Sequence, residues 1–334
     1  MHYGPVMIDL EGLELKPEER ALLKHARVGG VILFSRNYQN LDQLRNLVSD
    51  IRNTAKKPLL ISVDHEGGRV WRFNDGFTKL PPAARYAALY KKNKTKGLEL
   101  AYNAGWIMAS ELLECGIDIS LAPVLDLNKE VSEVVGDRAF HRDPKIVTAL
   151  AKSFVDGMNA VGMSATGKHF PGHGSCVLDS HIAKPVDPRT LEEIEGDDLI
   201  PFAKLSSRLG AVMPAHVTYP TVDSVPAGFS KIWLQDILRK KLKFKGVILS
   251  DCLSMKGAAI GGDFVVRAQM AIDAGCDMVI LCQQTRDLVS WVLDNLGREG
   301  SLESSQRLAA LAGKFQNEAR QAEKPSLAAM KEVS

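Results

Sequence analysis

The chain has 334 residues, of which 45% are hydrophobic and 25% are charged, and this composition excludes intrinsic disorder for most of its length. Its 42 Lys and Arg residues balance 40 Asp and Glu residues, giving a net charge of +2 without a basic block, so no nucleic-acid partner is expected. No apolar run reaches the roughly 18 residues that a membrane helix needs, and the N-terminus lacks the pattern of a signal peptide.

Five cysteines are scattered along the chain, and no Cys-x-x-Cys occurs. An odd number of unclustered thiols is typical of free cysteines in a reducing compartment. Together with the absent signal peptide, this predicts a cytoplasmic protein with no membrane partner. The cysteines are Cys115, Cys176, Cys252, Cys276 and Cys282.

Short apolar, β-branched runs alternate along the chain with longer amphipathic segments. This alternation predicts β/α units with a parallel sheet, and runs that are apolar on both faces suit strands inside a barrel. There are eight such runs: 6–8, 30–33, 59–63, 119–122, 165–167, 211–213, 246–249 and 278–281.

The segments between these runs predict helices over 41–53, 97–115, 144–161, 190–209, 230–242 and 265–275. Asp143 and Ser230 stand where N-caps are expected. Eight β/α units without a Pro/Gly/Ser-rich linker predict a single-domain α/β protein, a TIM (β/α)8 barrel over residues 1–300. A doubly wound sheet is the structural alternative. Residues 301–334 are expected to add one helix and a charged tail, packed on the barrel or trailing from it.

Barrel enzymes place their chemistry at the C-terminal ends of strands, so the polar residues that follow each run are candidates for a site. Nearly every run is followed by one: Asp9, Asp64, Asp126, Lys168 with His169, His216, Asp251 and Cys282. A barrel that served only as a scaffold would not need ionisable groups at so many strand ends.

The segment from Gly167 to Gly174 is the densest in such residues. His169 and His173 have the i, i+4 spacing of a zinc-binding helix, but Pro171 and the glycines make a helix there improbable. We therefore expect no metal at this pair. For His173, hydrogen bonding that holds the Gly/Pro loop is the preferred interpretation.

Asp179 and His181 are two residues apart, so in an extended segment both side chains project to the same side. The carboxylate can then orient the imidazole and favour the imidazolium, which is the form that a general acid needs. A solvated loop pair is the ordinary alternative. Gly172 and Gly174 could act as hinges if this loop moves during turnover.

Asp251 ends an apolar run, where a carboxylate either caps the following turn or attacks an electrophilic carbon to form a covalent intermediate. Asp64 also follows an apolar run and precedes paired glycines, which allow close approach of a ligand. Arg72 and Arg138 offer planar forks for hydroxyl or carboxylate groups.

Four segments together resemble glycoside hydrolase family 3, specifically the single-domain bacterial β-N-acetylglucosaminidases that recycle cell-wall fragments. They occur in family order and cover the barrel from Val6 to about Leu281. The segments are 32–37 (ILFSRN), 64–73 (DHEGGRVWRF), 168–174 with 179–181 (KHFPGHG and DSH), and 250–258 (SDCLSMKGA).

The resemblance implies that Asp251 is the nucleophile and that His181, oriented by Asp179, is the general acid/base. It also implies that five residues bind N-acetylglucosamine beside the scissile bond: Asp64, Arg72, Arg138, Lys168 and His169. The implied reaction is hydrolysis with retention through a glycosyl-aspartate, in which one carboxylate and one histidine replace the usual carboxylate pair.

The implied substrate is a small saccharide, a muropeptide fragment in which N-acetylglucosamine is linked to 1,6-anhydro-N-acetylmuramic acid, with or without peptide. Family members that cleave glucosides carry a second domain, and its absence favours the hexosaminidase branch. No cofactor is expected, and a monomer is expected. Phosphate as the acceptor in place of water is a lesser alternative.

Two residues depart from the family pattern. Cys252 stands where the family usually has a second aspartate, and His65 stands where it has glutamine. Cys252 leaves the nucleophile intact, but it removes a supporting carboxylate and places a thiol beside the site. His65 is expected to act behind the residues that touch substrate.

Two other functions compete with the glycosidase hypothesis. One is a metal-dependent barrel hydrolase that uses His169, His173, His216 and Asp251, but such barrels commonly carry His-x-His after the first strand, and this chain has Ile8-Asp9-Leu10 there. The other is an amino-sugar sensor without turnover. Retention of both Asp251 and His181 argues against a sensor, because binding alone needs no nucleophile.

Overall fold

Eight parallel strands form one sheet in the computed structural model, which describes residues 2–132, 134–180, 183–260, 262–297, 300–313 and 324–328. Each strand lies beside its neighbours in sequence, and the first pairs with the eighth. This order confirms the predicted barrel, because a doubly wound sheet would reverse direction partway through the sheet. The strands are β1 (Val6–Asp9), β2 (Val28–Leu33), β3 (Leu60–Val63), β4 (Ile119–Ser120), β5 (Thr166–Phe170), β6 (Ala211–Pro214), β7 (Val247–Cys252) and β8 (Met278–Leu281).

The barrel closes between β4 and β5 through an irregular segment. β4 has only two residues, and Pro123, which has no backbone N–H, follows soon after it. The chain nevertheless continues alongside β5: Thr166 N–H donates to the Ala122 carbonyl at 2.8 Å, and Leu125 N–H donates to the Lys168 carbonyl at 2.6 Å. These bonds place Asp126 next to the end of β5.

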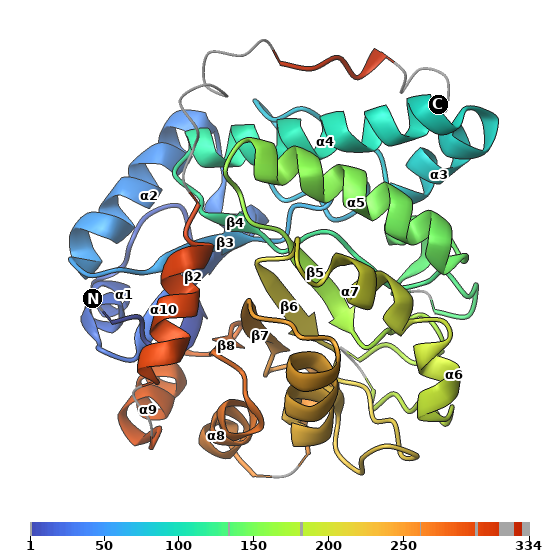
Figure 1. Cartoon of the computed structure of the whole chain (residues 1–334). Helices are drawn as coiled ribbons and strands as arrows, with labels where there is room; N and C mark the ends of the chain where they lie inside the picture. Colours follow the sequence, from blue (N-terminus) through green and yellow to red (C-terminus); the bar gives the residue numbers. More distant parts are fainter. Residues whose placement is uncertain are drawn as a thin grey trace.

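Helices surround the strands, as Figure 1 shows. The two longest, α4 and α5, pack side by side over the β4 and β5 region. The α-helices are α1 (Pro17–Lys24), α2 (Leu41–Ala55), α3 (Ala83–Lys92), α4 (Lys94–Glu114), α5 (Pro144–Ala160), α6 (Leu191–Glu195), α7 (Leu199–Leu205), α8 (Phe264–Ala274), α9 (Arg286–Asn295) and α10 (Leu302–Leu311). A π-helix, η4, spans Ile232–Lys241, and single 3-10 turns occur at Ser35–Asn37, Gly136–Arg138, Ala227–Phe229 and Lys256–Ala258. No described helix is long and apolar enough to cross a bilayer.

The predicted caps and helices agree with the structure except between residues 190 and 209. The Asp143 carboxylate accepts Lys145 N–H at 2.8 Å, and Ser230 Oγ accepts Trp233 N–H at 3.1 Å. The single helix expected over 190–209 is wrong, because two helices, α6 and α7, occupy that range. A continuous helix would place Pro201 in its interior, whereas the break at Gly196 leaves the proline in the first turn of α7.

Side chains from the strands fill the barrel, and α10 covers its N-terminal end. Leu308 and Leu311 of α10 join the apolar cluster inside the barrel, and the Arg307 guanidinium contacts the buried Asp277 carboxylate at 2.6 Å. The opposite, C-terminal end of the barrel is the end left for a pocket. The domain boundary near residue 300 stays a prediction.

Candidate active site

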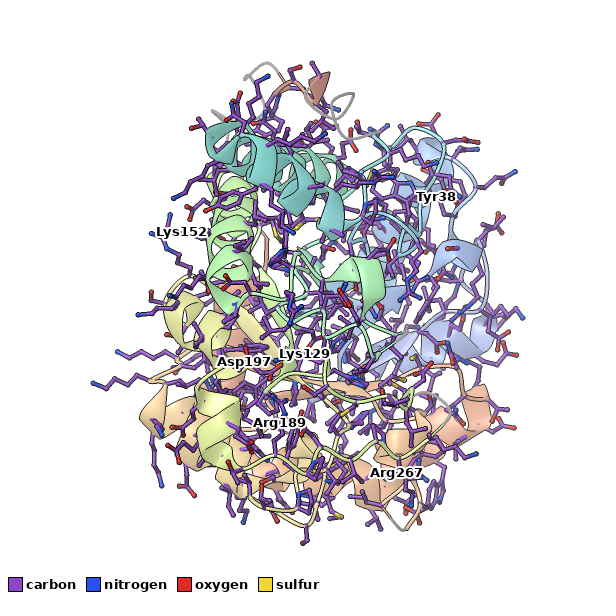
Figure 2. The ribbon with its side chains drawn as sticks, turned by 90° about the vertical axis from the view of Figure 1, so that its right-hand side faces the viewer. Tyr38, Lys129, Lys152, Arg189, Asp197 and Arg267 are labelled. Atoms are coloured by element: carbon purple, nitrogen blue, oxygen red, sulfur yellow. The ribbon has the colours of Figure 1, made fainter. Side chains whose placement is uncertain are left out.

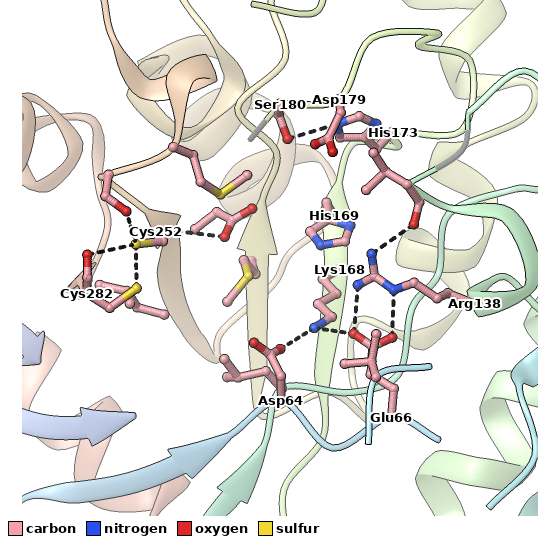
Figure 3. A pocket seen from close by; sticks show the side chains of 18 of the residues that line it. Asp64, Glu66, Arg138, Lys168, His169, His173, Asp179, Ser180, Cys252 and Cys282 are labelled. Atoms are coloured by element: carbon pink, nitrogen blue, oxygen red, sulfur yellow. Dashed lines mark hydrogen bonds and ion pairs between the residues drawn. The ribbon is translucent and has the colours of Figure 1, made fainter. Parts of the chain in front are cut away.

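A pocket of about 620 Å³ opens at the C-terminal ends of the strands. The predicted site residues that line it come from five segments far apart in sequence, namely Asp64, Arg72, Arg138, Lys168, His169, Asp179 and Asp251. The eighth, His181, lies outside the described residues. Figure 3 shows the pocket with its ion pairs and hydrogen bonds.

A buried network of charges forms the floor of this pocket. Lys168 Nζ lies 2.6 Å from an oxygen of Asp64 and 2.6 Å from an oxygen of Glu66. Arg138 donates to both oxygens of Glu66, from Nε at 2.8 Å and from Nη2 at 2.7 Å. Two cations thus alternate with two carboxylates (Figure 3). These ion pairs fix the orientation of the four charged side chains.

The network keeps Glu66 and Lys168 ionised although both are buried. Burial opposes ionisation of Glu66, but the Arg138 guanidinium and the Lys168 ammonium outweigh it and hold the pKa of Glu66 well below its usual range. Burial likewise opposes the charge on Lys168, and the carboxylates of Asp64 and Glu66 outweigh it and raise the Lys168 pKa. Such an array suits the hydroxyl groups of a sugar, because charged donors and acceptors make strong hydrogen bonds.

His169 is oriented by a buried carboxylate. Its Nδ1 lies 2.7 Å from Asp126 Oδ2, and the backbone N–H groups of His169 and His173 donate to Asp126 Oδ1 at 3.2 and 2.7 Å. Burial opposes ionisation of Asp126, but the adjacent His169 and His173 outweigh it and lower the pKa of Asp126. With Nδ1 held by Asp126, the imidazole can turn Nε2 toward the pocket.

His173 connects the floor of the pocket to the loop above it. Its Nε2 lies 3.2 Å from the Ser180 hydroxyl, and burial lowers the pKa of its imidazole. Figure 3 places Asp179, Ser180 and His173 together above His169. These contacts confirm that His173 holds the Gly/Pro loop by hydrogen bonding, and they place Asp179 over the pocket.

An ion cluster holds the far end of the same loop. Arg189 binds Asp187 and Asp198 with N–O distances of 2.6 Å, and Lys129 pairs with Asp197 beside them (Figure 2). Between these anchors the loop carries Val177, 70% exposed, at the rim of the pocket.

The two glycines predicted as hinges, Gly172 and Gly174, are packed tightly. A Cβ on Gly172 would lie 2.6 Å from Asp198, and one on Gly174 would lie 1.8 Å from the Leu127 carbonyl. The hinge function stays a prediction.

Asp251 is positioned by β7 and the turn that follows it. The strand pairing of β7 with β8 is irregular between Leu249 and Cys252, and Cys252 N–H donates to Asp251 Oδ1 at 2.7 Å. Behind them His216 Nε2 lies 3.1 Å from the Cys252 carbonyl. Burial lowers the pKa of His216, so a neutral imidazole can donate this bond and fix the turn.

Not every polar strand end contributes to the pocket. The buried Asp9 carboxylate instead binds Arg36 and Arg286, at 2.5 and 2.7 Å, which joins β1 to its neighbours. Across the described ranges no three His, Cys, Asp or Glu side chains are arranged to hold a metal ion. Asp126 holds His169 Nδ1, and the Cys252 carbonyl holds His216 Nε2, so each imidazole is fixed in its orientation.

Comparison with known proteins identifies the family to which this arrangement belongs. Residues 6–310 match the model of the glycosyl hydrolase family 3 N-terminal domain. The chain belongs to glycosyl hydrolase family 3. A β-hexosaminidase from Chromobacterium violaceum is 52% identical over 316 residues, which cover 94% of this chain and 88% of the relative. A β-hexosaminidase from Tolumonas auensis is 52% identical over 295 residues, 88% of this chain and 86% of the relative.

Solved structures of the family superpose closely. NagZ from Neisseria gonorrhoeae, in complex with N-trifluoroacetyl-D-glucosamine, is 41% identical with a TM-score of 0.91, covering 100% of this chain and 96% of that chain. A family 3 β-N-acetylglucosaminidase from Paenibacillus is 33% identical with a TM-score of 0.84, covering 96% and 62%. These findings confirm the resemblance predicted from the sequence and the enzyme class, a glycoside hydrolase of the β-hexosaminidase type.

Two residues of this site are absent from the catalytic and sugar-binding residues predicted from the sequence. Glu66 joins Arg138 to Lys168, and Asp126 orients His169. Asp126 was visible as a polar residue after the fourth strand, and Glu66 lies within the segment that carries Asp64. Neither position revealed its partners, because Glu66 and Arg138 are 72 positions apart in sequence and meet only in the folded chain.

His65, one of the two departures from the family pattern, sits behind the site. Its ring centroid lies 3.9 Å from that of Trp71, and among the described residues neither ring nitrogen has a hydrogen-bond partner. Burial, with a smaller contribution from Arg72, lowers the pKa of His65 to about 3. The imidazole therefore stays neutral in the folded protein well below the pH at which it protonates in the unfolded chain.

We expect this difference to make the protein acid-sensitive. Because the unfolded chain takes up a proton at His65 below its ordinary pKa of about 6.5, the free energy of unfolding falls as pH drops from there toward 3, by at most about 1.4 kcal/mol per pH unit from this residue. Urea unfolding of the wild type and of His65→Phe across this range measures the contribution. If the free energy of unfolding of His65→Phe depends on pH as that of the wild type does, His65 does not make this contribution. His2→Phe, at an exposed position, is the control.

Proposed function

We propose that the enzyme removes non-reducing terminal N-acetylglucosamine from muropeptide fragments by a retaining mechanism. Asp251 is the nucleophile, His181 is the general acid/base, and Asp179 orients His181. Asp64, Arg72, Arg138, Lys168 and His169 bind the sugar. The observation that carries the proposal is the convergence of Asp251 with the charged network and with Asp179 on a single pocket at the C-terminal end of the barrel.

The charged floor supports the choice of substrate. A neutral sugar offers hydroxyl groups that both donate and accept, and the floor offers both kinds of partner: carboxylate oxygens at Asp64 and N–H groups at Lys168 and Arg138. The Neisseria structure holds an N-acylglucosamine analogue within the same fold. A volume of about 620 Å³ leaves room for more than one sugar ring, so part of an aglycone can also enter.

In the proposed first step, an oxygen of Asp251 attacks the anomeric carbon while His181 gives its proton to the departing oxygen. The glycosidic C–O bond breaks, and a glycosyl ester forms on Asp251. In the second step, His181 takes a proton from water, which attacks the same carbon and releases the carboxylate. Two inversions give net retention. Cys252 N–H, at 2.7 Å from Asp251 Oδ1, helps to orient the carboxylate for the attack.

The identity of the aglycone and the cellular compartment belong to the proposal as well. The resemblance implies 1,6-anhydro-N-acetylmuramic acid, with or without peptide, as the leaving group, and the sequence predicts the cytoplasm and a monomer. The apolar residues Val177 and Leu178 at the pocket rim offer a surface that such a bulky aglycone can contact. A role in cell-wall recycling follows from this substrate.

The assignment of His181 rests on the sequence motif and is tested by the leaving group. With a poor leaving group, kcat/KM of His181→Ala is expected to fall by roughly 10²–10⁴-fold, because protonation then limits bond cleavage. With a nitrophenolate, which departs without a proton, kcat/KM should remain close to that of the wild type. Steady-state rates on aryl N-acetyl-β-glucosaminides of graded leaving-group pKa measure both. An equal loss on all of them would rule out His181 as the acid.

A further inference from the structure

Two thiols meet beside the candidate nucleophile. Cys252 ends β7 and Cys282 follows β8, and their Sγ atoms lie 2.7 Å apart without a disulfide between them (Figure 3). A disulfide bond is about 2.05 Å long, so a movement of less than 1 Å would join them. Both cysteines line the pocket, and Cys252 is partly exposed, so a small solute in the pocket can reach the pair.

Hydrogen bonds around Cys252 make its thiol more reactive than that of Cys282. Hydrogen bonds from Cys282 and from the Ser254 hydroxyl, whose Oγ lies 3.0 Å from Cys252 Sγ, lower the pKa of Cys252. The same hydrogen bond to Cys252, together with burial, raises the pKa of Cys282. One sulfur is therefore disposed to be a thiolate while its neighbour retains a proton, which is the arrangement of an attacking thiol and a resolving thiol.

The other cysteines lack this environment. Burial raises the pKa of Cys115 to about 11 and that of Cys176 to about 12, and it also raises the pKa of Cys276. All three are buried. Thiol oxidation should therefore be selective for the pair at the pocket.

We propose that Cys252 and Cys282 form an oxidation site, at which a hydroperoxide converts the two thiols into a disulfide and thereby lowers hydrolase activity. Cys252 Sγ attacks a peroxide oxygen, the O–O bond breaks, and the sulfur becomes a sulfenic acid while the released oxygen leaves as water or alcohol. Cys282 Sγ then attacks Cys252 Sγ, and the hydroxyl leaves as water with the Cys282 proton. The thiols lose two electrons, and the peroxide gains them.

The disulfide would act on catalysis through the turn that holds Asp251. Cys252 supplies the N–H that binds Asp251 Oδ1, and its carbonyl is held by His216, so a covalent pull toward β8 moves the groups that fix the carboxylate. A displacement of about 1 Å at a reacting group can cost about 10²-fold in rate. This link to activity rests on the proposed role of Asp251, whereas formation of the disulfide does not.

The test treats the reduced full-length enzyme with hydrogen peroxide and follows two quantities. Peptide mass mapping measures the Cys252–Cys282 disulfide, and hydrolysis of an aryl N-acetyl-β-glucosaminide measures activity. We expect one disulfide between these residues, a fall in activity of about 10²-fold, and recovery after dithiothreitol. Cys282→Ser should form no such disulfide and show no loss that dithiothreitol reverses. Cys115→Ser, at a position that directly follows α4 and does not line the pocket, should behave as the wild type.

Three results would overturn the proposal. If Cys252 and Cys282 remain thiols while peroxide oxidises other residues, the oxidation site is wrong. If the disulfide forms and activity is unchanged, the effect on catalysis is wrong. If Cys282→Ser loses activity as the wild type does and dithiothreitol restores it, the disulfide is not what lowers activity. The mass map does not depend on turnover, so failure of the Asp251 assignment would leave its result standing.

Discussion

Replacing Asp251 with alanine is expected to lower turnover of an aryl N-acetyl-β-glucosaminide by roughly 10⁴-fold or more, whatever the leaving group. The variant lacks the oxygen that forms the covalent bond, so neither a better leaving group nor a proton from His181 can restore the first step. Binding of the sugar should persist, because the charged floor around Lys168 is untouched. Initial rates with a nitrophenyl glycoside, together with the affinity for a substrate-like inhibitor, measure both effects.

A matched control is Asp236→Ala. This aspartate is exposed on η4 and pairs with Lys240 at 2.7 Å, a surface ion pair worth a few tenths of a kcal/mol. The Asp236→Ala variant should leave turnover unchanged.

Azide is a further probe of Asp251→Ala, since a small anion can fill the space left by the Asp251 carboxylate and attack the anomeric carbon from the same face. The α-glycosyl azide is the expected product. Near-normal hydrolysis by Asp251→Ala would contradict the assignment of Asp251 as the nucleophile.

Replacing Glu66 with glutamine is expected to lower the free energy of unfolding by about 3–5 kcal/mol and activity by about 10²-fold. Only 8% of the Glu66 side chain is exposed, and its carboxylate is shared by Arg138 and Lys168. Removing its charge leaves two buried cations with Asp64 as their remaining carboxylate partner in this network, and both lose the geometry that presents them to the sugar. Urea unfolding and steady-state kinetics measure the two losses.

The pH dependence of stability gives an independent check on Glu66. Its pKa is lowered in the folded protein, so its contribution is complete above the unfolded pKa of about 4.3 and is lost as pH falls from there toward the folded pKa. The pKa of Lys168 is raised, so its contribution is complete below about 10.4 and is lost as pH rises through the folded pKa. In Glu66→Gln the free energy of unfolding should therefore depend less on pH below about 4.3 than in the wild type.

The control for Glu66 is Glu99→Gln, an exposed residue of α4, which should change neither quantity. If Glu66→Gln unfolds at the urea concentration of the wild type, the charged floor contributes little to stability. If it is also fully active, the network does not position the sugar. Those two results together would contradict the interpretation of the pocket floor.

The barrel and most of its site were predictable from the sequence because their signals are local. An apolar run followed by a polar residue marks both a strand and its C-terminal end, and Asp64, Lys168, His169 and Asp251 all occur at such points. The break between α6 and α7 was also encoded locally, by Gly196 and Pro201, but the amphipathic pattern across 190–209 concealed it.

What the sequence did not predict depends on partners that only folding brings together. Asp9 and Asp251 both follow apolar runs. The Asp9 carboxylate binds Arg36 and Arg286, whereas Asp251 lines the pocket. Periodicity cannot distinguish these two outcomes. The same holds for Cys252 and Cys282, which are 30 positions apart in sequence and meet only because β7 and β8 are neighbours.

The most direct test of the central claim is to capture the sugar on the enzyme. His181→Ala should form the glycosyl ester quickly from a substrate with a good leaving group and hydrolyse it slowly, because the base for water is missing. Acid quenching during turnover, followed by peptide mass mapping, should find one N-acetylglucosaminyl group on Asp251. A protein that turns over with no adduct, or with the adduct on another residue, would contradict Asp251 as the nucleophile.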